Sequence, residues 1–150
     1  MSTYPDASVL LPTLIAEPTT EAVYDCLGAD GRGLLISDFA AAEVASALSR
    51  LVRMALLTDA DASARLADFD AWRAAMSSPV DISVSDTRLA YIFVRRFDLG
   101  LRAPDALHLA IARRLDATLV TLDRRLATAA RELGITVEDP RHPLARHPLA

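Results

Sequence analysis

Residues 103–126 read APDALHLAIARRLDATLVTLDRRL, and this stretch decides the fold class. Pro104 is tolerated in the first turn of a helix, and the almost wholly apolar run behind it predicts a buried helix over 104–115. Residues 118–121 then predict a strand, and 124–133 predict a second helix that Gly134 closes. A helix, a strand and a helix in succession are typical of a parallel α/β sheet.

The same alternation continues toward both ends of the chain. Further strands are predicted at 3–6, 33–37, 80–84 and 135–138. Further helices are predicted at 8–16, 19–28, 39–56, 59–76 and 86–97. Because the connections are long enough for crossovers, the whole pattern favours parallel strands flanked by helices.

Composition limits the chemistry that this chain can perform. It has 150 residues and is 52% hydrophobic, which suits one compact domain with its own core. The formal net charge is −4, so any nucleic-acid site must be a local basic patch. All 16 basic residues are Arg, and the lack of Lys excludes a P-loop and Schiff-base chemistry. Cys26 is the only cysteine, so no internal disulfide is expected, as suits a reducing cytoplasm.

The two ends of the sequence lead to further expectations. The first residues lack the positively charged start of a signal peptide, and no apolar run reaches the length of a membrane helix. We therefore expect a cytoplasmic protein without membrane contact. Residues 141–145, RHPLA, are repeated as 146–150, which predicts an extended and mobile tail over 140–150.

Four carboxylates interrupt apolar stretches, although ionised acids are rarely buried unless they are paired or bind a metal. They are Asp6, Glu43, Asp105 and Asp123. Asp6 and Asp123 end predicted strands, Asp105 opens a buried helix, and Glu43 lies beside an apolar helix stripe. Each also has a plain structural interpretation. The three Asp residues are suited to capping turns or helices, and Glu43 to reaching solvent from a boundary position.

Several of these acids thus lie at strand ends or helix starts of one parallel α/β chain, where ligands usually bind. Four carboxylates brought together repel one another unless a cation lies between them. Mg²⁺ or Mn²⁺ fits this role, because hard cations prefer oxygen ligands. Such a site polarises a phosphodiester and generates hydroxide for in-line attack.

Two polar residues stand close to these acids in the sequence. His108 follows Asp105 by three positions, so both side chains can share a helix face. A metal-binding or proton-shuttling His108 is one interpretation, and its apolar flanks favour the other, a core or boundary His with local hydrogen bonds. Thr121 precedes Asp123 by two positions and is suited to hydrogen-bonding a carboxylate or a phosphate.

Four segments carry the acids: PDASVL at 5–10, AEV at 42–44, PDALHLAIA at 104–112 and VTLDRRL at 120–126. Their order and spacing resemble the four acidic motifs of PIN domains, a family of metal-dependent ribonucleases, over about residues 3–139. The third and fourth segments carry most of the resemblance. It implies an α/β three-layer sandwich over 1–139, with a central parallel sheet of about five strands flanked by helices.

The resemblance also implies a site and partners. Asp6, Glu43, Asp105 and Asp123 would be the catalytic, metal-binding acids, with Ser8 and Thr121 as supporting polar groups and Mg²⁺ or Mn²⁺ as cofactor. The small size is most similar to VapC toxins of bacterial toxin–antitoxin pairs, which form homodimers and are inhibited by a small antitoxin. This implies an endoribonuclease toxin with an RNA substrate, a cognate antitoxin and a homodimeric state.

Within such a site, we expect Asp6, Asp105 and Asp123 to contact an ion. Glu43 would contact a second ion or orient the attacking water. Arg102 and Arg124 stand next to proposed ligands and are the best candidates for holding RNA phosphates, with a solvated helix face as the alternative. The helix pair within 40–76 either offers a groove for the antitoxin or fills the core of this domain.

Other functions are compatible with parts of the same pattern. A non-catalytic PIN-like binding module would keep the fold and use the acidic pocket only to receive an Arg-bearing partner. A structure-specific DNA nuclease shares the same chemistry. A receiver domain needs a Lys, which this chain lacks, and haloacid-dehalogenase-type phosphatases need an Asp where Ser8 stands, so both of these classes are disfavoured.

Overall fold

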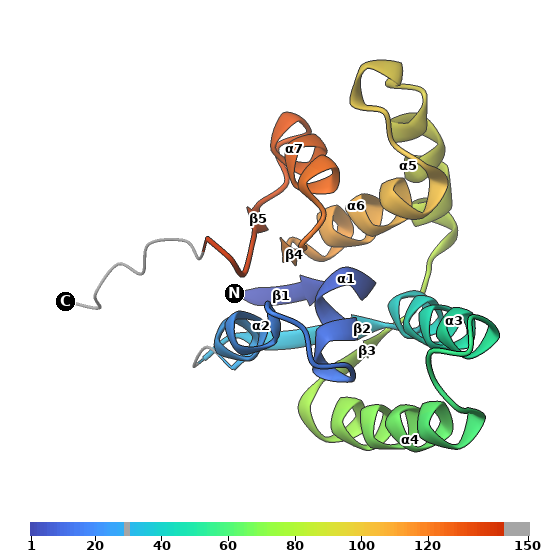
Figure 1. Cartoon of the computed structure of the whole chain (residues 1–150). Helices are drawn as coiled ribbons and strands as arrows, with labels where there is room; N and C mark the ends of the chain where they lie inside the picture. Colours follow the sequence, from blue (N-terminus) through green and yellow to red (C-terminus); the bar gives the residue numbers. More distant parts are fainter. Residues whose placement is uncertain (29–30, 143–150) are drawn as a thin grey trace.

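The computed structural model describes residues 1–28 and 31–142. Within these residues the centre is a five-stranded sheet in the order β3-β2-β1-β4-β5 (Figure 1). The strands are β1 (Ser2–Pro5), β2 (Gly33–Ser37), β3 (Ser78–Val80), β4 (Thr118–Val120) and β5 (Val137–Glu138). Every neighbouring pair is parallel, so the carboxyl ends of β1, β2 and β4 meet at one edge of the sheet.

The helices run between the strands, as the alternating sequence pattern predicts. They are α1 (Ala7–Leu10) with the 3₁₀ turn η1 (Leu11–Thr13), α2 (Thr20–Leu27), α3 (Asp38–Arg53), α4 (Asp59–Met76), α5 (Val84–Val94) with η2 (Phe97–Leu99), α6 (Ala103–Leu115) and α7 (Arg124–Glu132). Figure 1 shows them around the sheet, with α5, α6 and α7 above, α3 at the right and α4 below in that view.

Alternation along the strands places helices on both faces of the sheet. On β2, Leu34 and Ile36 pack in one cluster with residues of α1, α3 and α4, whereas Leu35 packs against the cluster that contains α5, α6 and α7. On β4, Leu119 joins the second cluster and Val120 packs with α1 and α2. Successive strand residues point to opposite faces. The predicted α/β three-layer sandwich with a five-stranded parallel sheet is therefore confirmed.

The strand predicted at 80–84 is wrong in its position. The strand is Ser78–Val80, and the alternating residues after it lead into α5. Ser83 caps that helix: Asp86 N donates to Ser83 Oγ at 3.2 Å, and Ser83 N donates to Asp86 Oδ2 at 2.8 Å. This reciprocal capping box satisfies two backbone donors of the first turn, so the helix begins where alternation alone predicted a strand.

Three predicted helices extend too far, and the one predicted at 86–97 ends at Val94. The helix predicted at 8–16 is α1 from Ala7, followed by the tighter η1, in which Pro12 lies. The helix predicted at 39–56 ends at Arg53, because Ala55 adopts a left-handed conformation with φ of 56°. A left-handed residue cannot continue a right-handed helix, so α3 stops and the chain turns into α4.

The predicted tail lies only partly within the described residues. Asp139 and His142 form an isolated β-bridge, and the Arg141 guanidinium donates to the Leu122 carbonyl at 2.9 Å, so the start of the tail is anchored to the domain. The remainder of the tail, 143–150, lies outside the described residues, and the predicted domain boundary stays a prediction. No helix in the described part of the chain has the length and hydropathy needed to cross a bilayer.

Candidate active site

Asp6 is the most deeply buried of the predicted ligands, with 5% of its surface exposed. It follows β1 and begins α1, and both of its carboxylate oxygens accept hydrogen bonds. Ser8 Oγ donates to Oδ1 at 2.5 Å, Val9 N donates to the same oxygen at 3.3 Å, and Thr121 Oγ1 donates to Oδ2 at 2.6 Å. Thr121 lies 115 residues away in sequence, and parallel pairing of Pro5 with Val120 brings it beside Asp6.

The buried carboxyl of Asp6 has an unusual electrostatic environment. Burial raises its pKa above the ordinary value of 3.8, and hydrogen bonds from Ser8 and Thr121 oppose this only in part. Among residues 1–28 and 31–142, no basic side chain forms an ion pair with Asp6. A divalent cation is the kind of group that would stabilise this buried carboxylate in its charged form.

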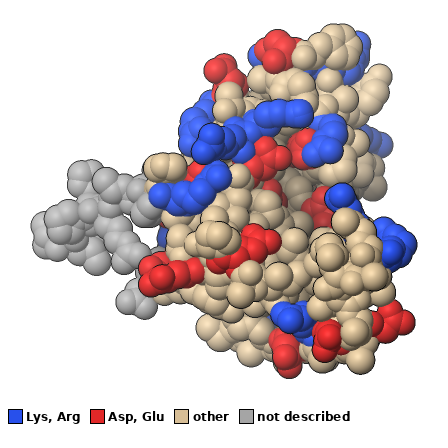
Figure 2. Space-filling view, in the orientation of Figure 1, with Lys and Arg blue, Asp and Glu red and all other residues tan. Residues whose placement is uncertain are grey.

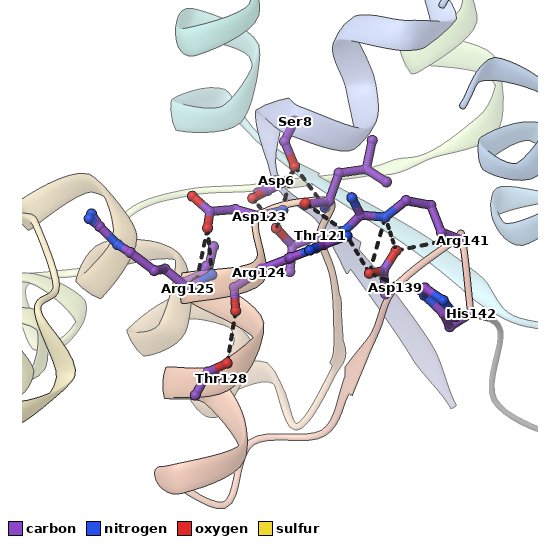
Figure 3. Close-up of polar contacts among 12 residues, drawn as sticks. Asp6, Ser8, Thr121, Asp123, Arg124, Arg125, Thr128, Asp139, Arg141 and His142 are labelled. Atoms are coloured by element: carbon purple, nitrogen blue, oxygen red, sulfur yellow. Dashed lines mark hydrogen bonds and ion pairs between the residues drawn. The ribbon is translucent and has the colours of Figure 1, made fainter. Parts of the chain in front are cut away.

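Asp123 lies beside Asp6 in a single hydrogen-bonded group (Figure 3). Its Oδ1 accepts from Arg125 N at 2.8 Å and Leu126 N at 3.2 Å, so Asp123 caps α7. Asp123 N donates to Thr121 Oγ1 at 3.0 Å, and Leu122 N donates to Ser8 Oγ at 2.9 Å. Ser8 and Thr121 therefore connect the ends of β1 and β4, as supporting polar groups would.

Glu43 belongs to a second group at the same edge. Its Oε2 lies 2.5 Å from His108 Nε2, and the other ring nitrogen, Nδ1, lies 2.9 Å from the Tyr4 hydroxyl. That hydroxyl also lies 2.9 Å from Ser37 Oγ. His108 is 3% exposed, so the interpretation as a core His is right, but its hydrogen bonds join distant elements and are not local.

Asp105 lies in the first turn of α6, one turn before His108. Its Oδ2 accepts from Arg102 N at 3.2 Å and is 3.4 Å from Arg102 Nε. The capping interpretation is therefore correct for Asp105, as it is for Asp6 and Asp123. These contacts use only one oxygen of each carboxylate: within the described residues, Asp105 Oδ1, Asp123 Oδ2 and Glu43 Oε1 accept no hydrogen bond.

The topology places the four acids toward one edge of the sheet, but only Asp6 and Asp123 belong to the same hydrogen-bonded group. Asp6 and Asp123 share Thr121, whereas Glu43 contacts His108 and Asp105 contacts Arg102. No set of three or more His, Cys, Asp or Glu side chains in the described residues is close enough together to hold a metal ion. The donor chemistry still fits a hard cation, because the acids supply oxygen ligands alone and Asp6 is buried with no basic ion-pair partner among residues 1–28 and 31–142.

Arginines flank the acids. Figure 2 shows Arg side chains over the part of the surface where α7 lies in Figure 1, with carboxylates in the hollow below them. The Arg102 side chain is 74% exposed beside Asp105, and exposed Arg124 lines a hollow with Arg125, Thr128 and residues of η2. Sequence reasoning did not single out Arg141, which donates to Leu122 O beside the acids, because only the tertiary structure brings it there.

These features define an α/β protein with carboxylates at the carboxyl edge of its parallel sheet, and comparison with known families agrees. The family model for the PIN domain matches residues 3–132. The chain therefore belongs to the PIN domain family. No curated protein sequence matches it.

Solved structures with the same fold have low sequence identity to the chain. VapBC2 from Rickettsia felis, bound to a DNA fragment from its promoter, has a TM-score of 0.71 at 17% identity, covering 93% of this chain and 98% of that one. VapC20 from Mycobacterium tuberculosis, a sarcin-ricin loop cleaving toxin, has a TM-score of 0.65 at 15% identity, covering 85% and 95%. A toxin–antitoxin complex from Klebsiella pneumoniae has a TM-score of 0.65 at 16% identity, covering 94% and 99%.

Proposed function

We propose that the protein is a divalent-metal-dependent endoribonuclease and the toxin component of a type II toxin–antitoxin pair. The observation that carries this proposal is the buried Asp6 carboxylate, which lies beside Asp123 at the carboxyl edge of the sheet with no basic partner among the described residues. Membership of the PIN domain family supports the nuclease activity. The similar structures described as a VapBC complex and as a sarcin-ricin loop cleaving VapC toxin support the toxin role.

The proposed cofactor is Mg²⁺ or Mn²⁺, held by Asp6, Asp105 and Asp123, with Glu43 contacting a second ion or orienting water. When bound, such an ion polarises the phosphodiester and lowers the pKa of water. Ser8 and Thr121 hold the two oxygens of Asp6 in place, which keeps this ligand preorganised. Arg102 and Arg124 are proposed to hold RNA phosphates at the rim.

A cognate antitoxin is the proposed protein partner. A hollow between η1, α2 and α4 is lined by Thr13, Leu14, Tyr24, Arg65, Asp68, Phe69 and Trp72. Phe69 is 4% exposed and packs in the core, so the core interpretation is correct for this residue, while Trp72 is only partly buried. We propose that the hollow receives an apolar segment of the antitoxin.

The proposed location is the cytoplasm. RNA substrates are found there, and a chain with a single cysteine needs no oxidising compartment to form an internal disulfide.

The function is tested by cleavage of RNA and DNA by the purified protein, free of antitoxin, with Mg²⁺, Mn²⁺ or EDTA. The Asp6→Ala variant controls for contaminating nucleases, and Asp70→Asn, on an exposed position of α4, is a matched change in charge away from the site. We expect metal-dependent RNA cleavage that Asp6→Ala abolishes and Asp70→Asn retains. Cleavage confined to DNA would establish the structure-specific nuclease instead. Failure of the folded protein to cleave any cellular RNA would favour the non-catalytic binding module.

A homodimer is proposed through the surface of α5 and η2. The segment that forms α5 and η2 carries four large exposed apolar side chains, which are Val84, Tyr91, Ile92 and Phe97. Phe97 is 87% exposed. Clusters of this kind mark protein interfaces. We expect Phe97→Asp to convert a dimer into a folded monomer in sedimentation velocity, because a buried unpaired charge opposes association. Met54→Asp, at an exposed position after α3, should leave the dimer intact, and a monomeric wild type would contradict the proposal.

A further inference from the structure

A buried hydrogen-bonded chain runs from the start of α3 through β1 to α6 and ends on Glu43. It consists of Ser37, Tyr4 and His108, which are almost fully buried, and Glu43 at its outer end is the only member that reaches solvent. Ser37 Oγ lies 2.9 Å from the Tyr4 hydroxyl, and this hydroxyl lies 2.9 Å from His108 Nδ1. His108 Nε2 lies 2.5 Å from Glu43 Oε2. The proposed function gives no role to His108, although both of its ring nitrogens have partners.

One arrangement of protons satisfies every member of this hydrogen-bonded series. Ala40 N donates to Ser37 Oγ at 3.0 Å, so the Ser37 proton is available to the Tyr4 oxygen. A phenol keeps its proton at neutral pH, and the Tyr4 hydroxyl then donates to His108 Nδ1. Glu43 Oε2 is a carboxylate oxygen that accepts, so its 2.5 Å contact with His108 Nε2 calls for a proton on Nε2. Every donor therefore has an acceptor, and the last donor is aimed at the carboxylate.

Packing fixes the orientation of the His108 ring. The Phe39 ring lies at a centroid distance of 5.0 Å and the Tyr4 ring at 5.7 Å, both tilted against the imidazole. The ring is thus held by two aromatic side chains and by hydrogen bonds at both nitrogens. Glu43, by contrast, has a flexible side chain that is 29% exposed. The contact with the His108 ring holds Glu43 Oε2 in place. The other oxygen, Glu43 Oε1, accepts no hydrogen bond among the described residues.

We propose that His108 is a positioning residue, which holds the Glu43 carboxylate at the acidic edge so that its second oxygen is presented to a divalent cation. This rests on the proposed role of Glu43 in the metal site. Partners that hydrogen-bond a metal ligand commonly change metal affinity by about 10–100-fold when they are removed. His108 would therefore act on metal affinity through Glu43, without contacting RNA.

The test measures Mn²⁺ binding by isothermal titration calorimetry, without RNA, beside RNA cleavage. His108→Leu removes the donor and should weaken Mn²⁺ binding by about 10-fold or more, with little change in KM for RNA. His108→Gln keeps an N–H donor toward Glu43 and should restore most of the affinity. In a Glu43→Gln background, His108→Leu should cause no further loss, because the effect passes through Glu43. Melting curves establish that each variant is folded.

A second measurement does not depend on metal or substrate. The ¹⁵N and ¹H spectrum of the His108 ring should show a proton on Nε2 and none on Nδ1, and Tyr4→Phe should weaken that preference. A proton on Nδ1 alone would overturn the proposal, as would unchanged Mn²⁺ affinity in folded His108→Leu or absence of Mn²⁺ binding by the wild type. Wild-type protein whose Mn²⁺ affinity depends on Glu43 and His108 as described, but which cleaves no RNA, would overturn the proposed function and leave the positioning role supported.

Discussion

Mn²⁺ at roughly one hundred times its dissociation constant is expected to stabilise the protein by about 2.7 kcal/mol, because it binds the folded state alone. In a domain of this length, that corresponds to a rise of roughly 5–11 °C in melting temperature. The rise should disappear in Asp6→Asn, which keeps the shape of the side chain and its capping ability but removes the charge. Differential scanning calorimetry of both proteins, with and without Mn²⁺, makes the comparison.

The same variant tests the environment of Asp6 without metal. Because burial raises the pKa of Asp6, its protonated form favours folding, and this contribution is lost as pH rises from 3.8 through the higher pKa of the folded state. At neutral pH without metal, Asp6→Asn should therefore melt at a higher temperature than the wild type, and the difference should shrink in acid. Asp70→Asn should behave like the wild type in both series. An equal Mn²⁺ shift in Asp6→Asn would place the ion elsewhere.

Removing Arg114 is expected to cause the largest loss of stability. The Arg114 guanidinium donates to Asp86 Oδ1 at 2.7 Å and to Oδ2 at 2.9 Å, and the Asp86 side chain is 1% exposed. Arg114→Met leaves a buried carboxylate without its partner, which costs about 3 kcal/mol, the lower end of the usual range since Arg114 is partly exposed. The melting temperature at pH 7 should fall by roughly 6–12 °C.

A matched control exists in the same chain. Arg96 contacts Asp98 with the same two-pronged geometry, at 2.9 Å and 2.6 Å, but both side chains are at least half exposed. Arg96→Met should change the melting temperature little, because exposed ion pairs contribute little to stability. Equal losses in both variants would mean that burial of Asp86 does not set the cost.

The Asp86 pair also predicts a pH dependence. Burial raises the pKa of Asp86, but the hydrogen bonds from Arg114 and Ser83 outweigh it and hold the pKa below 3.8. The stability that this pair contributes is present above pH 3.8 and is lost as pH falls through the lower pKa of the folded state. The difference between the wild type and Arg114→Met should therefore be largest near neutral pH and decrease in strong acid.

Sequence alone determined that parallel strands are flanked by helices. It also determined that most of the proposed ligand acids lie at a strand end or a helix start. Pro104 at a helix start, Gly134 at a helix end and the apolar strands between them are local signals, so they can be recognised without knowledge of distant contacts. Local signals also identified Asp6, Asp105 and Asp123 as candidate metal ligands, since each lies where a strand ends or a helix begins. These signals also left capping as an alternative for each of them, and the structure shows that all three are caps.

Only the tertiary structure decided how distant segments meet. Parallel pairing of β1 with β4 places Thr121 beside Asp6, and side-chain contacts between α3 and α6 bring Glu43 and Phe39 to His108. The prediction placed the third strand at 80–84 instead of 78–80, because residues 80–84 alternate as a strand does. A capping box formed by Ser83 and Asp86 starts a helix there instead. Local patterns report backbone preference, whereas the partners of a buried polar group depend on strand order and register, which the pattern of one segment does not contain.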